Sequence, residues 1–220
     1  MLSCHGVSKT YQKGIRQIKA VRDVSLEFGE GIHMITGKSG SGKTTLLKVL
    51  GGISAPDQGE VRFENRNIYT LNEDEQAEIR SRDFSFIFQF FQLIPEYTVF
   101  DNMALPLYIR KEEGVQEKVR TAAKMLSIEN LLDRMPEELS GGQQQRTAIG
   151  RSLISGARVI FADEPTGNLD RETSTQMMDI FRKIKKDRVI LMVTHDLQLL
   201  EYADYAYHME DGRIQRRTCR

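Results

Sequence analysis

Short apolar runs recur along the chain, each bounded by turn residues. They are IHMIT (32–36), FSFIF (84–88), VIFA (159–162) and VILMV (189–193). Continuous apolar runs of this length are typical of strands buried on both faces of a parallel sheet. Helical periodicity lies between them, most clearly after Asp170, an expected N-cap, where Met177, Phe181 and Ile184 recur and the last turn is basic. The alternation of strand and helix predicts an α/β fold.

Other stretches depart from this alternation. VRDVSLEF (21–28) and GEVRFENRNI (59–68) have the pattern of antiparallel strands, and residues 90–155 have a mostly helical pattern. Near the end, YAYHMEDGRI (205–214) predicts a hairpin that turns at Asp211 and Gly212. We therefore expect one domain over 1–220, with a core from 1–89 and 156–220 and a helical lobe at 90–155.

Composition and charge narrow the classes of function. The 31 Lys and Arg balance 31 Asp and Glu, so the chain lacks the basic field that holds nucleic acid, and we expect no nucleic-acid partner. No apolar run approaches the roughly 20 residues that cross a bilayer, and the first residues lack the pattern of a signal peptide. A cytoplasmic location is expected.

The segment GKSGSGKT (37–44) matches G-x-x-x-x-G-K-[ST] between a predicted strand and a predicted helix. In that context we favour a phosphate-binding loop over an ordinary glycine-rich turn. Backbone N–H groups would surround the β-phosphate, Lys43 would reach the β- and γ-phosphates, and the Thr44 hydroxyl would ligate Mg²⁺. The candidate nucleotide-binding residues here are Gly37, Lys38, Ser39, Gly40, Ser41, Gly42, Lys43, Thr44 and Thr45.

Polar residues follow three of the predicted strands. Asp163 would hold magnesium through water, and Glu164 would polarise the attacking water as general base. Gln89 would supply an amide oxygen near the metal, and His195 would sense the γ-phosphate. The simpler alternatives are a solvated strand end for the carboxylates and surface positions for Gln89 and His195.

Taken together, GKSGSGKT, Gln89, LSGGQQQR (139–146), VIFADEP, NLD (168–170) and His195 resemble, in this order, the motif set of ATP-binding-cassette (ABC) ATPases. The resemblance runs from about Leu2 to the end and implies a P-loop NTPase (RecA-like) core with a mostly parallel sheet, an N-terminal antiparallel section and a helical lobe. The segments ADEPTGNLD and FQFFQLIPEYTVFDNMALPL resemble the subgroup for lipoprotein release, macrolide export and antimicrobial-peptide resistance, which includes a cell-division ATPase. Lys38, Thr44 and Gly150 depart from the usual Pro, Ser and Ala.

The resemblance implies ATP and Mg²⁺ as cofactors and a head-to-tail dimer with a second copy. In such a dimer the LSGGQ turn of one subunit caps the γ-phosphate bound by the other. The Ser140 hydroxyl and the N–H groups of a helix start suit a second anion site, although a plain serine N-cap with a glycine turn is the alternative. The remaining residues implied are Gly141, Gly142 and Gln143 at the nucleotide, Tyr11 stacked on adenine, and Asp170 at the dimer interface. For Tyr11 the alternative is an ordinary strand tyrosine.

A separate integral membrane permease is the implied partner, with this chain peripheral on the cytoplasmic face of the membrane. The apolar segment 89–100 would dock it, with Phe91 and Tyr97 as contacts; the alternative is that both residues belong to the core. A second hypothesis is an ATPase module that switches a membrane-anchored hydrolase or sensor. A soluble translation or DNA-repair ATPase would need a second cassette or a coiled-coil insertion, and a nucleotide kinase has no use for LSGGQ.

Overall fold

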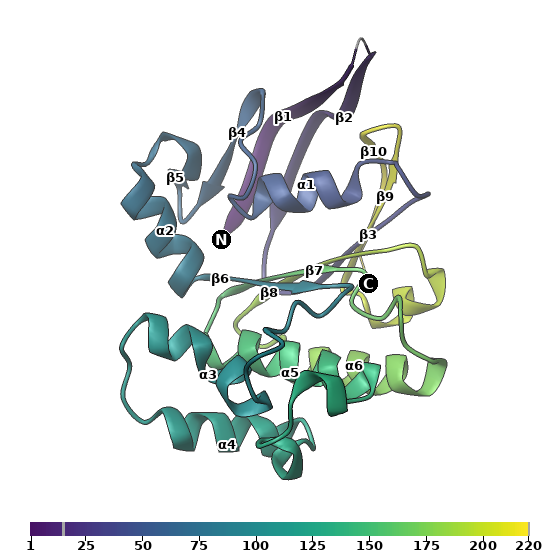
Figure 1. Ribbon diagram of the computed structural model, residues 1–220. Helices are drawn as coiled ribbons and strands as arrows, with labels where there is room; N and C mark the ends of the chain where they lie inside the picture. Colours follow the sequence, from purple (N-terminus) through teal and green to yellow (C-terminus); the bar gives the residue numbers. More distant parts are fainter. Residues whose placement is uncertain (15, 220) are drawn as a thin grey trace.

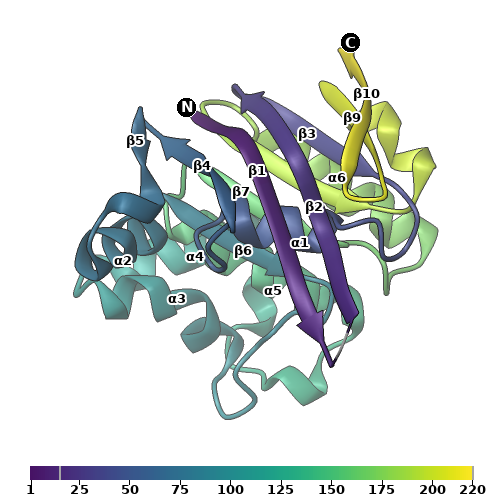
Figure 2. The same cartoon turned by 90° about the horizontal axis from the view of Figure 1, so that it is seen from above.

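The structure is a computed structural model that describes residues 1–14 and 16–219. Two sheets form its upper and middle layers, and most of the helices lie below (Figure 1). The upper sheet has four antiparallel strands in the order β2-β1-β4-β5. Their bounds are β1 (Leu2–Lys13), β2 (Arg16–Phe28), β4 (Gln58–Phe63) and β5 (Arg66–Asn67). From above, β1 and β2 lie over helix α1 (Lys43–Leu50) (Figure 2).

The second sheet has six strands in the order β10-β9-β3-β8-β7-β6. All neighbours are parallel except β9 and β10, which form the predicted hairpin. The bounds are β3 (Gly31–Thr36), β6 (Phe84–Phe88), β7 (Val159–Asp163), β8 (Val189–Thr194), β9 (Tyr205–Glu210) and β10 (Arg213–Cys219). The predicted parallel strands and the α/β class are thus confirmed.

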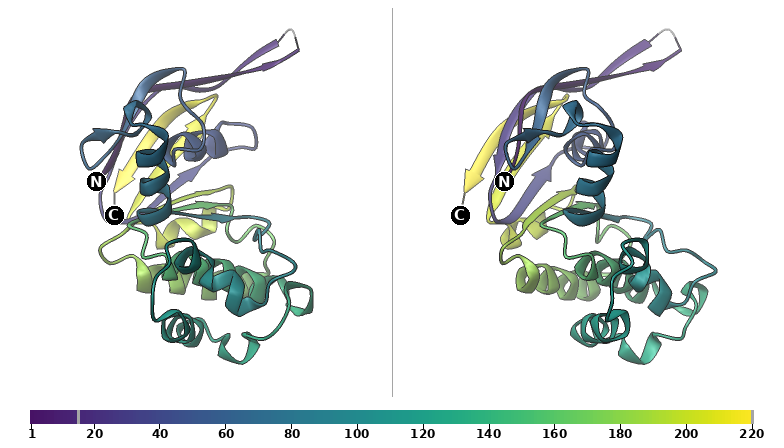
Figure 3. Two further views of the ribbon diagram at one scale, coloured as in Figure 1. Left: turned by 60° about the vertical axis from the view of Figure 1, so that its left-hand side comes forward. Right: turned by 90° about the vertical axis from the view of Figure 1, so that its left-hand side faces the viewer.

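Both faces of β3, β7 and β8 are buried, which explains their unbroken apolar runs, whereas β6 is only partly buried. In β7, Phe161 faces the cluster around α1 while its neighbours Ile160 and Ala162 face the helices on the other side. The helices on that other side form a layer that contains α3 (Val99–Ile109), α4 (Val115–Met125), α5 (Gly141–Ile154) and α6 (Arg171–Ile184). The side views show α3 and α4 on one flank of this layer, away from the upper sheet (Figure 3).

Three local features differ from the sequence expectations or go beyond them. The stretch 59–68 is not one strand, because Glu64 and Asn65 both have positive φ and turn the chain from β4 into β5. Helix α2 (Glu73–Arg82) has no apolar stripe, since only Ile79 is buried, and it starts with a capping box formed by Asn72 and Glu75. The remaining short helices are η1 (Ile68–Thr70), η2 (Glu129–Leu131), η3 (Pro136–Glu138) and η4 (Leu197–Tyr202).

Gly150, a departure from the family pattern, has a packing reason in α5. A Cβ built at this position would lie 2.5 Å from Cε of the buried Met103 and 3.1 Å from Leu126 Cδ1. The methionine thus occupies the space that an alanine methyl group would need. Among the residues the structure describes, no helix has the length and apolar character needed to cross a membrane.

Candidate functional site

An open cleft of about 700 Å³ lies where strands β6, β7 and β8 end. The carboxyl ends of parallel strands are where α/β sheets commonly bind ligands. Eleven of the sequence-predicted site residues line it, and Ile18 and Ala20 of β2, which were not predicted, line it as well. The predicted ones are Tyr11, Ser39, Gly40, Gly42, Lys43, Thr44, Thr45, Gln89, Asp163, Glu164 and His195.

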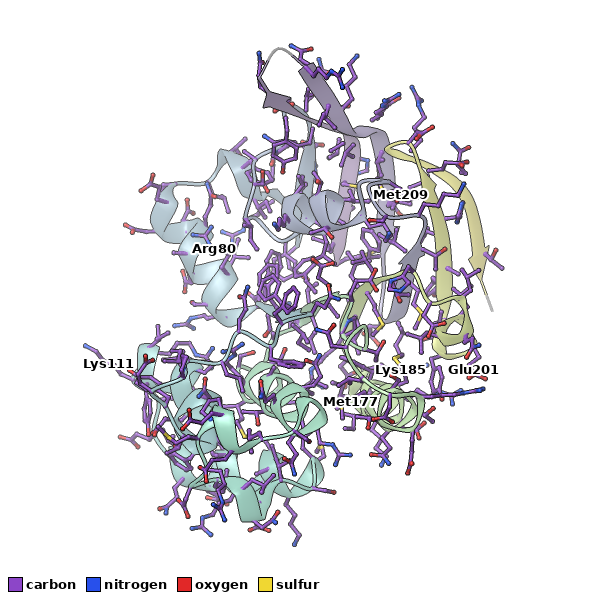
Figure 4. The ribbon with its side chains drawn as sticks, turned by 45° about the vertical axis from the view of Figure 1, so that its right-hand side comes forward. Arg80, Lys111, Met177, Lys185, Glu201 and Met209 are labelled. Atoms are coloured by element: carbon purple, nitrogen blue, oxygen red, sulfur yellow. The ribbon has the colours of Figure 1, made fainter. Side chains whose placement is uncertain are left out.

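The phosphate loop is supported from behind by distant parts of the chain. A Cβ at Gly37 would lie 2.1 Å from the Met209 carbonyl oxygen, and one at Gly42 would lie 2.0 Å from that of Ala20. Met209 comes from β9 and its side chain reaches the start of α1 (Figure 4). The hairpin turn also binds the loop, because Gly212 N donates to Ser41 O at 3.0 Å. Both glycines are therefore required by close backbone contact.

Lys43 lies at the centre of the loop and is only 7% exposed. Its ammonium donates to the carbonyl oxygens of Gly37 at 2.7 Å and Lys38 at 3.0 Å. Burial lowers the pKa of Lys43, while the nearby carboxylates of Glu164 and Asp163 act in the opposite direction. A phosphate in the cleft would favour the charged amine in the same way as these carboxylates do.

Thr44 and Asp163 bring two oxygen ligands together. The Thr44 hydroxyl donates to Asp163 Oδ1 at 2.9 Å. Burial raises the pKa of Asp163, and the Thr44 hydrogen bond partly offsets this. A hydroxyl, a carboxylate and the Gln89 amide, which lines the same cleft, are hard oxygen ligands of the kind that would suit Mg²⁺. The buried Ser41 hydroxyl, which has no hydrogen-bond partner within the described residues, adds a further donor at the loop.

Glu164 is held beside His195. Its Oε2 lies 2.9 Å from His195 Nδ1 and 3.3 Å from the His195 backbone nitrogen. Glu164 also has φ of +48°, a left-handed conformation that is uncommon for a residue other than glycine. Strained backbone conformations tend to cluster at functional sites, where the surrounding structure enforces them. The carboxylate thus lines the cleft with its orientation fixed by two donors.

The LSGGQ turn lies outside this cleft. Ser140 caps α5, with its hydroxyl accepting from Gln143 N and its own N donating to Gln143 Oε1 at 2.9 Å. The Gln144 amide donates to the carbonyl oxygens of Pro136 and Leu139. The capping alternative therefore accounts for more of this motif than the sequence indicated. Even so, Ser140 is exposed, and none of residues 140–143 lines the cleft.

Other predicted residues do not line the cleft, namely Gly37, Lys38 and Ser41 of the phosphate loop, and Phe91, Tyr97 and Asp170. Asp170 is the N-cap of α6 as expected, and its carboxylate accepts from Thr173 N and Oγ1. Tyr97 is 41% exposed and Phe90, which was not singled out, is 74% exposed. Phe91 is half-buried, and its ring lies close to Gly141 at the LSGGQ turn.

The strand–loop–helix phosphate site, the carboxylates after β7 and the separate LSGGQ turn define an ATP-binding cassette built on a P-loop NTPase core. Residues 21–167 match the family described as ABC transporter. The chain is 41% identical over 217 residues to the macrolide export ATP-binding/permease protein MacB of Chlorobium phaeobacteroides, which covers 97% of this chain and 33% of that protein. The chain thus spans about a third of the length of that relative.

Solved structures agree with the sequence comparison. The dimeric bacterial ABC transporter cassette MJ0796 superimposes with a TM-score of 0.92 at 35% identity, over 100% of this chain and 98% of that one. The cassette cbiO1 of Clostridium perfringens, part of the complex cbiONQ, gives 0.89 at 26% identity, over 99% and 88%. The chain belongs to the ABC transporter family and is one of its ATPase cassettes.

Proposed function

We propose that this chain binds ATP with Mg²⁺, dimerises head to tail around two nucleotides and hydrolyses them to drive a membrane permease. The exported or extracted substrate would be a lipoprotein, a peptide or a drug-like molecule. The macrolide export relative is named as an ATP-binding/permease protein, and the present chain corresponds to about a third of its length. This supports a permease partner and an export role.

Each group in the cleft has a chemical task in this proposal. The phosphate loop and Lys43 would bind the β- and γ-phosphates, and Tyr11 would stack on the adenine. Thr44, Asp163 and Gln89 would hold Mg²⁺, which neutralises developing charge on the phosphates. Glu164 would accept a proton from the attacking water, and His195 would orient Glu164 and contact the γ-phosphate.

The position of the LSGGQ turn is the main observation that supports the proposed dimer. Ser140 and the N–H groups at the start of α5 form a second anion-binding helix end that is exposed and does not line the chain's own cleft. A second copy placed head to tail would bring this turn to the phosphates of the first. MJ0796 was solved as a dimer, and a further structure of it at 34% identity and a TM-score of 0.92 holds ADP and Pi.

The test is Glu164→Gln. The variant keeps the size and hydrogen-bonding reach of the side chain but loses its basicity. We expect ATP affinity close to wild type, turnover reduced about 10²- to 10⁴-fold, and a dimer that persists in ATP and magnesium. Phosphate release and size-exclusion elution measure the two effects.

Glu117→Gln is the matched control, since Glu117 is an exposed residue in the first turn of α4. It should leave turnover and elution unchanged. Wild-type turnover in Glu164→Gln would remove Glu164 from the role of general base.

A further inference from the structure

Gln89 and Asn168, which are 79 residues apart, bind each other through both ends of the asparagine amide. Asn168 Nδ2 donates to the backbone oxygen of Gln89 at 3.0 Å, and Gln89 Nε2 donates to Asn168 Oδ1 at 3.4 Å. Gln89 follows β6, and Asn168 lies in the loop between β7 and α6. The contact therefore joins the ends of two neighbouring strands at the edge of the cleft.

This pair fixes the orientation of both amides. A backbone carbonyl oxygen can only accept, so the Asn168 side chain must present its NH₂ group to Gln89 O. The Asn168 Oδ1 atom then faces the Gln89 side chain. Because this oxygen can only accept a hydrogen bond, Gln89 must turn its NH₂ group toward it. As a result, the Gln89 Oε1 atom is the one left without a hydrogen bond among the described residues. Gln89 lines the cleft, and an oxygen is what a magnesium ion requires.

Neighbouring groups support this arrangement. A Cβ at Gly167 would lie 3.2 Å from Gln89 Nε2, so a side chain there would press on the amide. Gly167 N donates to Glu164 O, and Leu169 N donates to Thr166 O, both at 3.0 Å. These turns fix the loop next to Glu164, and Asp170 two residues later caps α6. Asn168 is thus presented to Gln89 from a short loop held at both ends.

We propose that Asn168 is a positioning residue that aims the Gln89 amide oxygen into the cleft, toward the metal that accompanies the nucleotide. The proposal rests on the magnesium-dependent nucleotide site proposed above. Asn168 itself does not touch the nucleotide or the metal. Its effect passes entirely through Gln89.

The experiment measures how much Mg²⁺ improves nucleotide binding. A fluorescent, non-hydrolysable ATP analogue is titrated into wild type, Asn168→Ala, Gln89→Ala and the double variant, with EDTA and then with Mg²⁺. Asn168→Ala should bind the analogue in EDTA as wild type does, while the gain in affinity caused by Mg²⁺ falls by about tenfold, as for other residues that orient a metal ligand. In the Gln89→Ala background the same change should have no further effect.

Several results distinguish this role from a structural one. Asn168→Asp keeps the acceptor for Gln89 Nε2 but places an oxygen against Gln89 O, so it should lose most of the gain as well. Asn130→Ala, at an exposed asparagine in η2, is the control and should behave as wild type. Because Asn168 is exposed, both Asn168 variants should keep the wild-type melting temperature.

The proposal is overturned if Asn168→Ala keeps the full Mg²⁺ gain, or if it weakens binding equally with and without Gln89. Loss of binding in EDTA or a lowered melting temperature in both Asn168 variants would show a structural role and overturn it too. If wild type itself showed no Mg²⁺-dependent binding, the proposed function would fail, and this outcome is separate from the others.

Discussion

His33 is a buried histidine whose hydrogen bonds define its neutral form. It is 1% exposed and stacks on Tyr205 with ring centroids 4.5 Å apart. Nε2 lies 2.8 Å from the Gly29 carbonyl oxygen, to which it must donate, so Nδ1 accepts from the Tyr207 hydroxyl at 3.1 Å. Protonation at Nδ1 would remove that acceptor. Burial lowers the pKa of His33 below its usual 6.5, although the Gly29 bond and the Asp204 carboxylate oppose the shift.

This shift makes stability depend on pH. Between the lowered pKa of folded His33 and 6.5, the unfolded chain binds more protons than the folded one. The contribution of neutral His33 to the free energy of unfolding should therefore be complete above pH 6.5. It should fall as the pH drops toward the folded pKa, by at most about 1.4 kcal/mol per pH unit. Asp204 has a lowered pKa and titrates in a more acidic range.

Urea unfolding between pH 5 and 8 checks this expectation. His33→Gln should be less stable than wild type at pH 7.5 but should show a shallower loss on acidification. His5→Gln, an exposed histidine in β1, serves as the control and should keep the wild-type slope. An unchanged slope in His33→Gln would assign the pH dependence to other groups.

At the scale of elements, the loop from Gln89 to Thr98 is attached to the helical layer at two points. Arg151 of α5 donates to the carbonyl oxygens of Gln92 at 2.8 Å and Phe91 at 3.1 Å. The fully buried Asn102 of α3 lies within 3.1 Å of the Ile94, Tyr97 and Thr98 carbonyl oxygens. The loop is thus a fixed support that presents Phe90 and Tyr97 to solvent.

This loop carries the docking prediction. Phe90→Asp and Tyr97→Asp place a carboxylate at exposed positions, so folding and basal ATPase should stay near wild type, while recovery with detergent-solubilised membranes and stimulation by them should fall. Phe91→Asp should instead lower the melting temperature, because its half-buried ring packs against the LSGGQ turn, where a carboxylate would have no partner.

The control for the loop is Met125→Asp, at an exposed position that ends α4. It should retain membrane recovery. If Phe90→Asp and Tyr97→Asp remain folded and are still recovered with membranes, the loop is not the docking surface.

The sequence predicts best those site residues that directly follow a predicted strand. The phosphate loop, Asp163 and Glu164 follow apolar runs directly, so strand ends placed them in one cleft. The contact of Phe91 with the LSGGQ turn was not predictable, since the chain has positive φ at Phe91 and Gln92, and Arg151, which binds both carbonyl oxygens, lies far along the chain. Helix α2 was missed because it buries only Ile79, although the Asn72–Glu75 capping box was a usable signal. Asn168 could not be paired with Gln89 because the sheet order that joins them is not local.

At the scale of the whole molecule, the arrangement of two glycine turns predicts complementation between subunits. Lys43→Ala destroys one phosphate loop, and Ser140→Arg blocks one LSGGQ turn. A dimer that contains one copy of each variant has one intact site, whereas either variant alone has none. Random mixing should restore about a quarter of wild-type ATPase, because half the dimers are mixed and each keeps one of two sites in a symmetric pair.

The ATPase of the equimolar mixture is compared with that of each variant alone. A mixture of Lys43→Ala with the double variant Lys43→Ala/Ser140→Arg has no intact site and is the matched negative control. If the first mixture were as inactive as this control, both glycine turns would serve a nucleotide within one chain.

The hairpin of β9 and β10 closes the phosphate loop from behind, through Met209 O against Gly37 and Gly212 N bound to Ser41 O. This has a consequence for biosynthesis. Residues 37–44 leave the ribosome early, soon after Ala20, which contacts Gly42, but Met209 and Gly212 are synthesised much later, and domains generally fold as units. A nascent chain that stops before residue 205 therefore carries the phosphate-binding motif without the hairpin that contacts Gly37 and Ser41.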